Sequence, residues 1–341
     1  VCALLYGSQT GTQCREKGKD TGMETKTKTK KTHAPRLHAA GSSIRRNWQL
    51  HLMILIPIIY VIIFYYGPMY GAQIAFRDYR PRAGITGSEW VGFKWFIKFF
   101  NNYKFWDILK NTLLISFYSL ATFPLPVIFA LLLNALPSER FKKLTQTISY
   151  MPHFISVVIV VTILNIVLSP VNGIYGVFYR LFGGAGIAAD IRTTVGAFRH
   201  MYIWSGVWQT LGWNTIIYTA ALASVSQELH EAAMLDGASR FKRILHVDLP
   251  AIMPTVAIML IMRCGSIMSI GFEKVYLMQY PTNITVSEII STHVYKVGMG
   301  STSDMSYASA IGLFNSVINC IMLIFVNWLS KKVSKDEVSM F

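Results

Sequence analysis

Six long apolar stretches constrain the fold of this chain more than any other feature of its sequence. They are residues 50–66, 113–133, 147–168, 201–223, 251–272 and 307–329. A helix of about 20 apolar residues crosses the ~30 Å hydrocarbon core of a bilayer. Within these stretches the only formally charged residue is Arg263, in the fifth. Because a backbone in lipid must satisfy its hydrogen bonds internally, we expect six transmembrane helices in an all-α polytopic membrane protein.

Composition favours a membrane protein over a soluble one. Hydrophobic residues make up 52% of the 341 residues and charged residues 14%, against ~25% charged residues in soluble domains. The net charge of +15 would indicate nucleic-acid binding in a soluble protein. Here, however, ten basic and three acidic residues lie within residues 1–47, which is typical of a cytoplasmic tail. We therefore predict a chain that lies in a lipid bilayer and binds no nucleic acid.

The six stretches define one transmembrane domain, residues 48–335, between two tails, residues 1–47 and 336–341. With the N-terminus inside, the cytoplasmic parts carry 19 Lys and Arg residues and the external parts carry 12. The positive-inside rule then places both termini in the cytoplasm. The first tail contains a low-complexity Lys/Thr tract, which we expect to be disordered. We expect Met23 to be the natural start and residues 1–22 to be upstream sequence.

A cytoplasmic loop between the fourth and fifth stretches, residues 224–254, has a helical pattern of its own. Ser226 is placed to cap a helix over 227–235, because a serine side chain can accept a hydrogen bond from the first helical turn. Asp236 and Gly237 are expected to end this helix, since glycine tolerates the left-handed conformation found at helix ends.

A second short helix is expected over 239–246, with Asp236 as its cap. Pro250 and Pro254 are expected to close the loop and to begin the fifth span, because proline is tolerated in the first turn of a helix. Two short helices bent at a glycine would present small and apolar side chains to the cytoplasm. Such a surface is typical of a docking site for a partner protein.

The residues at this bend resemble a known family motif. The sequence reads Glu231-Ala232-Ala233-x-x-Asp236-Gly237-Ala238, with Phe241, Pro250 and Pro254 downstream. It resembles the EAA loop of binding-protein-dependent ABC importer permeases, and it precedes the penultimate span, as in that family. Ile244 stands where many members have Phe.

Other segments resemble the permeases for complex oligosaccharides within this family. They are Tyr150-Met151-Pro152-His153-Phe154-Ile155-Ser156, Leu168-Ser169-Pro170, Arg263-x-Gly265-Ser266, Gly271-Phe272-Glu273 and Trp90-Val91-Gly92-Phe93. The resemblance covers about residues 45–335. It implies the type I ABC importer permease architecture and a location in the bacterial cytoplasmic membrane.

The resemblance also implies partners and a mechanism. A second related permease, two cytoplasmic ATPase subunits and an extracellular sugar-binding protein would complete an importer for an oligosaccharide. The EAA residues would contact the ATPase, with Glu231 either holding the geometry of the loop or making that contact. The chain has no GxxxxGK[ST] phosphate loop. We therefore expect a non-catalytic subunit without a cofactor, with ATP and Mg²⁺ bound by the partner ATPases.

Several polar and aromatic residues of the spans are candidates for a substrate path, each with a structural alternative. Indole rings stack on sugars and amides bind hydroxyls, but Trp is also enriched at membrane interfaces. Arg263 is costly in a membrane, so it marks either a functional site or a structural charge bonded within the bundle. Glu273 is either a solvated interfacial carboxylate or a ligand contact, and Asn315 and Asn319 line the path or bond across helices. For His153 we expect a hydrogen bond between helices. The candidates are Trp208, Trp213, Asn214, Arg263, Ser266, Glu273 and Asn315.

Other functions are weighed against this one. A stand-alone secondary transporter or channel would need intramembrane carboxylates or inverted repeats, and the six stretches contain no Asp or Glu. A membrane-embedded enzyme would need clustered acids or an HExxH site, which the sequence lacks. The four cysteines have no metal-ligand spacing, so no metal site is predicted. The external segments carry twelve basic and seven acidic residues, which suits an anionic sugar.

Overall fold

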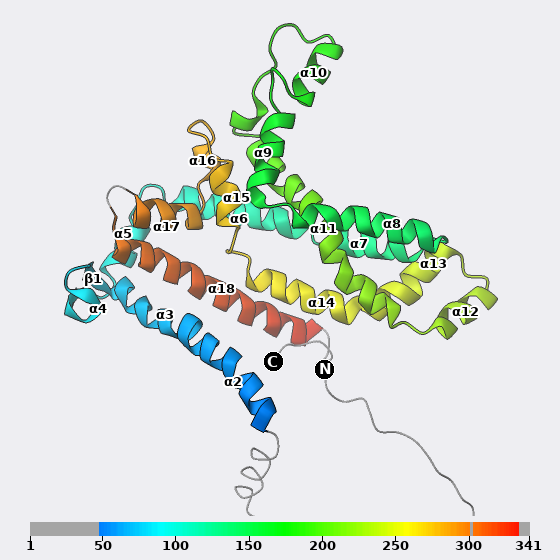
Figure 1. Cartoon of the computed structure of the whole chain (residues 1–341), viewed down its shortest axis with the longest axis horizontal. Coiled ribbons are helices and arrows are strands. Elements are labelled where there is room, and N and C mark those ends of the chain that lie inside the picture. Colours follow the sequence, from blue (N-terminus) through cyan, green and yellow to red (C-terminus); the bar gives the residue numbers. More distant parts are fainter. Residues whose placement is uncertain (1–47, 301–302, 334–341) are drawn as a thin grey trace, which may run out of the picture. The chain divides into compact units, whose positions relative to one another are not determined.

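Helices cover most of the six apolar stretches in the computed structural model, which describes residues 48–300 and 303–333 (Figure 1). Both predicted tails, residues 1–47 and 336–341, and with them the predicted start at Met23, lie outside the described residues. The chain divides into two units, residues 1–63 and 64–341. In the first unit the described residues form an apolar helix, and the second unit holds the buried clusters.

Helices dominate the first half of the described chain. In order, its elements are α2 (Trp48–Val61), the π-helix η1 (Ile62–Tyr66), α3 (Gly67–Met69), the 3₁₀ helix η2 (Tyr70–Phe76), β1 (Arg77–Arg80), α4 (Gly84–Gly87), β2 (Ser88–Trp90), α5 (Lys94–Phe100), α6 (Phe105–Ala121), α7 (Pro124–Asn134), α8 (Glu139–Tyr150), the 3₁₀ turn η3 (Met151–Phe154), α9 (Val157–Val167) and α10 (Ile174–Leu181). The strands β1 and β2 form an antiparallel hairpin with Arg77 opposite Trp90.

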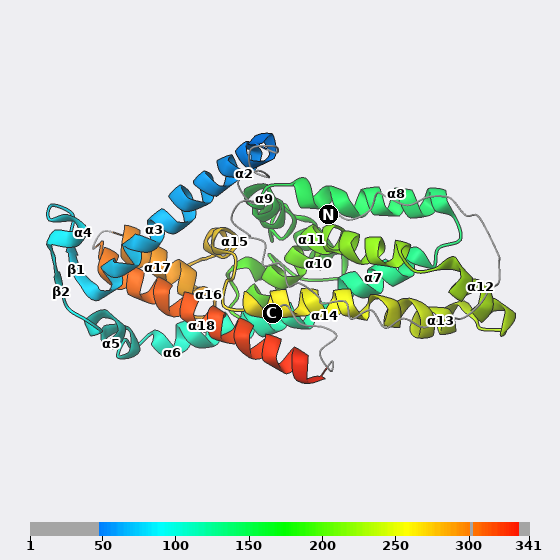
Figure 2. The same cartoon turned by 90° about the horizontal axis from the view of Figure 1, so that it is seen from below.

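The second half contains the longest helices. Its elements are the 3₁₀ turn η4 (Ile191–Thr193), α11 (Phe198–Ala223), α12 (Gln227–Leu235), α13 (Arg240–Arg243), the π-helix η5 (Ile244–Asp248), α14 (Leu249–Gly265), α15 (Phe272–Leu277), α16 (Ile284–Ser287), α17 (Ile290–Met299) and α18 (Met305–Val333). The helix α11 packs along α7, α8 and α14, while α18 packs along α14 and α17 (Figures 1 and 2).

Four described helical segments are long and apolar enough to cross a membrane. They are Trp48–Phe76, Phe105–Asn134, Arg240–Gly265 and Met305–Trp328, and a bent pair of helices would make a fifth. The helix α11 matches the predicted fourth span in position and has 26 residues. It is less apolar than those four because tryptophan, glycine, tyrosine and amide residues interrupt its aliphatic ones.

The predicted third span, residues 147–168, is wrong as a single helix. The chain bends by 100° between the segment that ends at Phe154 and α9. Pro152 lies in the 3₁₀ turn η3, Ile155 is extended, and the Ser156 hydroxyl accepts a hydrogen bond from Ile159 N to begin a new helix. Proline has no N–H for the helical ladder, so the helix stops here and restarts in another direction.

The predicted fifth span also differs from the structure at its end. The helix stops at Gly265 rather than at residue 272, and two turns follow it. Asn319 of α18 stabilises this turn, because its Oδ1 accepts from Met268 N at 3.0 Å and its Nδ2 donates to Ser269 Oγ at 2.8 Å. Asn319 therefore bonds across helices, which was one of the two alternatives for this residue.

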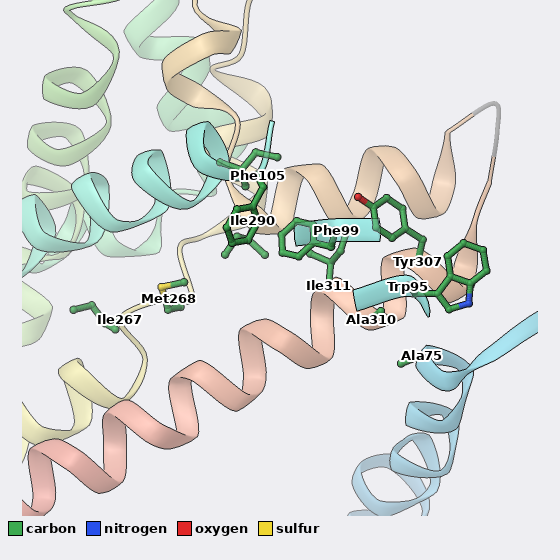
Figure 3. Packing of buried hydrophobic residues seen from close by; sticks show 11 residues of the cluster. Ala75, Trp95, Phe99, Phe105, Ile267, Met268, Ile290, Tyr307, Ala310 and Ile311 are labelled. Carbon is green, nitrogen blue, oxygen red and sulfur yellow. The ribbon is translucent and has the colours of Figure 1, made fainter. Parts of the chain in front are cut away.

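Buried aromatic residues pack α5, α17 and the start of α18 together at one end of the second unit (Figure 3). Phe99 is 1% exposed and makes an edge-to-face contact with Phe105 at 5.0 Å between ring centroids. Tyr307 and Ile311 of α18 belong to the same cluster, as does Met268 from the turn after α14. This core fixes the turn after Gly265 against α18.

Close approach of α11 to α8 depends on one glycine. A Cβ atom at Gly212 would overlap the carbonyl oxygen of Ser149. We expect Gly212→Ala to lower the thermal unfolding temperature of the purified protein, because overpacking of this kind costs ~1–3 kcal/mol. Gly312→Ala in α18 is the matched control, since a Cβ there meets nothing within 4 Å. Equal unfolding temperatures of the two variants would contradict the tight packing of α11 on α8.

Candidate functional site: a helical loop joined to a membrane cavity

The helix α12 has the predicted start and end. It spans Gln227–Leu235, and the Ser226 hydroxyl accepts a hydrogen bond from Glu228 N at 3.2 Å. Gly237 has a φ of 73°. The N–H of Gly237 donates to the Met234 carbonyl at 3.0 Å, and the N–H of Ala238 donates to the Ala233 carbonyl at 2.9 Å. This pair of hydrogen bonds is a Schellman motif, in which the left-handed residue satisfies the last carbonyls of a helix.

The second half of the loop differs from the prediction in two ways. Ser239, not Asp236, caps α13, because its hydroxyl accepts from Lys242 N, while Asp236 ends α12. The expected helix over 239–246 is not separate from the fifth span. It continues through η5 into α14, so that one helical segment runs over Arg240–Gly265. Pro250 and Pro254 lie inside it, and the π-helical turn η5 precedes Pro250, where a widened turn accommodates the missing N–H of proline.

The loop presents apolar side chains at its surface. Leu235 at the end of α12 is 90% exposed and Phe241 in α13 is 69% exposed. Glu231 is exposed as well and accepts a hydrogen bond from Gln227 Nε2 at 3.1 Å. Ala232 is exposed, and Ala233 and Ala238 are half-buried at the bend. Large apolar side chains exposed on a defined loop indicate an interaction site.

Sequence reasoning missed the buried contact that holds α12 in place. Asp248 of η5 is 4% exposed, and its Oδ1 lies 3.3 Å from Nε2 of His230 on α12. The same oxygen accepts from Asn134 Nδ2, at the end of α7, at 3.4 Å. Asp248 therefore ties α12 and α7 to the helix that leads into α14. The signal in the sequence is an acidic residue between Val247 and Leu249, directly before the apolar stretch of the fifth span.

A cavity of about 780 Å³ lies among α7, α11, α14 and α15. This volume falls within the ~300–1,000 Å³ of typical small-molecule sites. Five of the seven predicted path residues line it, although they come from three separate parts of the chain: Trp213, Asn214, Arg263, Ser266 and Glu273. Residues that the prediction missed line it too, among them Tyr202, Gln209, Thr210 and Lys274.

Two predicted path residues do not line the cavity. Trp208 is 49% exposed and lies outside it. The helical period turns this residue about 160° away from Thr210 on the same helix. Asn315 of α18 also lies outside, with a buried Oδ1 that has no hydrogen-bond partner among the described residues. For these two residues a role in the substrate path stays a prediction, because they do not line this cavity.

The bend after α8 positions an aromatic wall of the cavity. The His153 ring stacks on the Trp213 ring, with 4.2 Å between centroids and 4° between planes. Phe154 contacts the edge of the same indole at 5.9 Å. His153 therefore joins the two helices by ring stacking, and the expected hydrogen bond between helices is not found in the described part of the chain. The stack fixes the indole plane beside Asn214.

Basic side chains gather at the cavity where α14 ends. Arg263 Nη2 donates to Ser119 Oγ at 2.5 Å, so the guanidinium bonds within the bundle and also lines the cavity. Lys274 of α15 is 8% exposed. Burial lowers the pKa of its ammonium group to about 8, because the charged form loses hydration. The sequence carries no local sign of this burial, since Lys274 follows an exposed Glu273 outside the apolar stretches.

Comparison with known proteins gives the family. Residues 122–335 match the family described as "binding-protein-dependent transport system inner membrane component". The polygalacturonan/rhamnogalacturonan transport system permease protein YteP of Bacillus subtilis is 42% identical over 85% of this chain and 89% of its own length. Protein LplB of the same organism is 40% identical over 90% of this chain and 98% of its own length.

Solved structures resemble the chain to a similar extent. A chain from a bacterial ABC transporter involved in the import of the acidic polysaccharide alginate superposes with a TM-score of 0.78 at 37% identity, covering 86% of this chain and 99% of that one. A chain of the bacterial alginate ABC transporter in complex with an alginate pentasaccharide-bound periplasmic protein gives 0.79 at 35% identity, covering 88% and 99%. The chain has the type I permease fold and belongs to the family of binding-protein-dependent transport system inner membrane components.

Proposed function

We propose that this chain is the permease subunit of an ATP-driven ABC importer that moves an oligosaccharide into the cytoplasm. An extracellular binding protein delivers the sugar, and a second related permease completes the pathway. Two cytoplasmic ATPase subunits supply the energy. The names of the relatives support a carbohydrate cargo, since they include transport of polygalacturonan/rhamnogalacturonan and of alginate. The complex with a sugar-bound periplasmic protein supports the delivery step.

The observation that carries this proposal is the continuous helical segment Arg240–Gly265. It begins in the exposed loop and ends beside the cavity, where Arg263 and Ser266 line the wall. With a rise of 1.5 Å per residue, such a segment spans ~40 Å. A displacement of the loop by the ATPase therefore moves one wall of the cavity, because the helical segment is continuous between the two.

The polar and aromatic lining of the cavity suits a sugar. The Trp213 ring offers a flat face, and Asn214, Thr210 and Gln209 offer amide and hydroxyl groups. An indole stacks on the apolar face of a pyranose, while amides and hydroxyls bind its hydroxyl groups. In this arrangement the chain orients the cargo and changes its access to the two sides of the membrane.

The proposed orientation in the membrane places the N- and C-termini in the cytoplasm.

The proposal is tested by reconstitution in liposomes with the second permease, the ATPases and the binding protein. We expect ATP hydrolysis that increases when sugar-loaded binding protein is added outside, together with uptake of the sugar. Uptake should stop without ATP. If the purified chain alone moved an oligosaccharide without ATP, the alternative of a stand-alone secondary transporter would replace this proposal.

A further inference from the structure

Lys274 is a buried ammonium group at the wall of the cavity. It lies in the short helix α15, and its side chain reaches α11. Its Nζ is 5.3 Å from the centroid of the Tyr202 ring. A Cβ atom at Gly206 would lie 3.5 Å from the same nitrogen, so the ammonium group lies close to the backbone of α11 at Gly206. The residue as a whole is 8% exposed.

No carboxylate of the described residues neutralises this ammonium group. Each ion pair in the described part of the chain involves another cation, and the Lys274 ammonium group donates no hydrogen bond there. Glu273 lines the same cavity but is exposed and makes no ion pair with its neighbour. A buried charge without a partner is unfavourable. The face of Tyr202 compensates for it only in part.

A second cation lines the same cavity. Arg263 lies at the end of α14, and its described hydrogen bond is to the neutral Ser119 hydroxyl. The charged groups in the wall are therefore Arg263 and Lys274 against the single carboxylate of Glu273. The two cations leave the cavity with a positive potential, which attracts an anion and disfavours a cation.

We propose that Lys274, assisted by Arg263, forms a carboxylate-binding subsite that makes the transporter selective for acidic oligosaccharides of the uronate type. The inference rests on the proposed function and specifies its cargo. The ammonium group pairs with a sugar carboxylate that enters the cavity, and this pairing supplies the partner that the chain itself lacks. Trp213 and Asn214 bind the ring and hydroxyl groups of the same saccharide.

The test compares trigalacturonate with its methyl ester, which has the same rings and no charge. We expect the complete transporter with its binding protein to take up the acid in preference to the ester. Lys274→Met should lower uptake of the acid by roughly tenfold or more, as expected when one partner of a desolvated charge pair is lost. Lys274→Arg should retain most of it. Lys110→Met is the matched control, because Lys110 is exposed and outside the cavity.

A second measurement separates ligand binding from folding. Trigalacturonate should raise the unfolding temperature of the wild-type complex, because a ligand that binds the folded state stabilises it. Lys274→Met should remove this increase without lowering the unfolding temperature of the ligand-free complex, since the variant buries no unpaired charge. Undiminished stabilisation by the acid in Lys274→Met, or equal loss in Lys274→Arg and Lys274→Met, would overturn the subsite.

The outcomes distinguish this inference from the function on which it rests. Uptake of neutral oligosaccharides with no uptake of the acid would overturn the acidic subsite and leave the oligosaccharide importer standing. No ATP-dependent uptake of either kind of oligosaccharide would overturn the proposed function itself.

Discussion

Replacement of Gly237 by proline should abolish sugar-stimulated ATP hydrolysis in the reconstituted transporter while the helices remain inserted. Gly237 has a φ of 73°, which proline cannot adopt, and proline also removes the N–H that donates to Met234. A cost of ~3 kcal/mol or more lowers the population of the correct loop conformation by about two orders of magnitude. The measurement is ATPase activity together with the amount of ATPase subunit that copurifies with the permease.

Two further variants sharpen this result. Gly237→Asn is the matched control, because asparagine tolerates the left-handed conformation, and it should keep most of the coupling. Ala233→Trp should uncouple the transporter as Gly237→Pro does, since Ala233 is half-buried at the bend and a large ring overpacks its surroundings. Wild-type ATPase stimulation in both Gly237→Pro and Ala233→Trp would refute the assignment of this loop as the coupling site.

Loss of the Glu288 carboxylate should cause a large drop in stability. Glu288 precedes α17 and is 7% exposed. Its Oε1 lies 3.2 Å from His293 Nδ1 and 3.8 Å from Lys296 Nζ, and its Oε2 lies 3.3 Å from Lys104 Nζ. Glu288→Gln leaves these basic groups without their anion, which costs ~3–5 kcal/mol for a buried pair. We expect a clearly lower unfolding temperature, whereas Glu89→Gln, at an exposed position in β2, should be neutral.

The same carboxylate predicts how stability depends on pH. Burial alone would raise the pKa of Glu288, but the hydrogen bond with His293 and the charges of Lys296 and Lys104 lower it from 4.5 to about 2. A carboxyl group with a lowered pKa in the folded state stabilises that state above its unfolded pKa. This stabilisation of ~3 kcal/mol is lost as the pH falls from 4.5 towards 2. Unfolding temperatures of the wild type should therefore fall over this range more steeply than those of Glu288→Gln; parallel curves would contradict the assignment.

Local sequence signals predicted the first helix of the loop over residues 224–254. Ser226, Gly237 and the spacing between them were sufficient for the bounds of α12, because capping and left-handed glycine act within one helical turn. The same reasoning failed for the second helix of the loop, which was expected as a separate helix over residues 239–246. A proline predicts a helix start only if no preceding turn can accommodate it, and η5 accommodates Pro250 inside a continuous helix. Asp236 was a plausible cap, but Ser239 lies at the position whose side chain reaches Lys242 N.

The cavity could be predicted only in part. Trp213, Asn214 and Arg263 stand out as polar or aromatic residues in apolar stretches, and the structure brings them together. Trp208 stands out equally but points elsewhere, because its place on the helix turns it away from the cavity. The burial of Lys274 could not be predicted from the neighbouring residues, since it depends on the packing of α15 against Tyr202 and Gly206 of α11.

The sequence by itself determined the positions of most helices, the bend at Gly237 and the family, because hydropathy, capping and motif spacing are properties of neighbouring residues. The tertiary structure decided the 100° bend after Phe154 and the continuity of Arg240–Gly265. It also decided which residues surround Lys274 and Glu288. The physical reason is that the burial and charge of a group depend on segments far away in the chain. Lys104 meets Glu288, and Gly206 meets Lys274, only after the helices have packed.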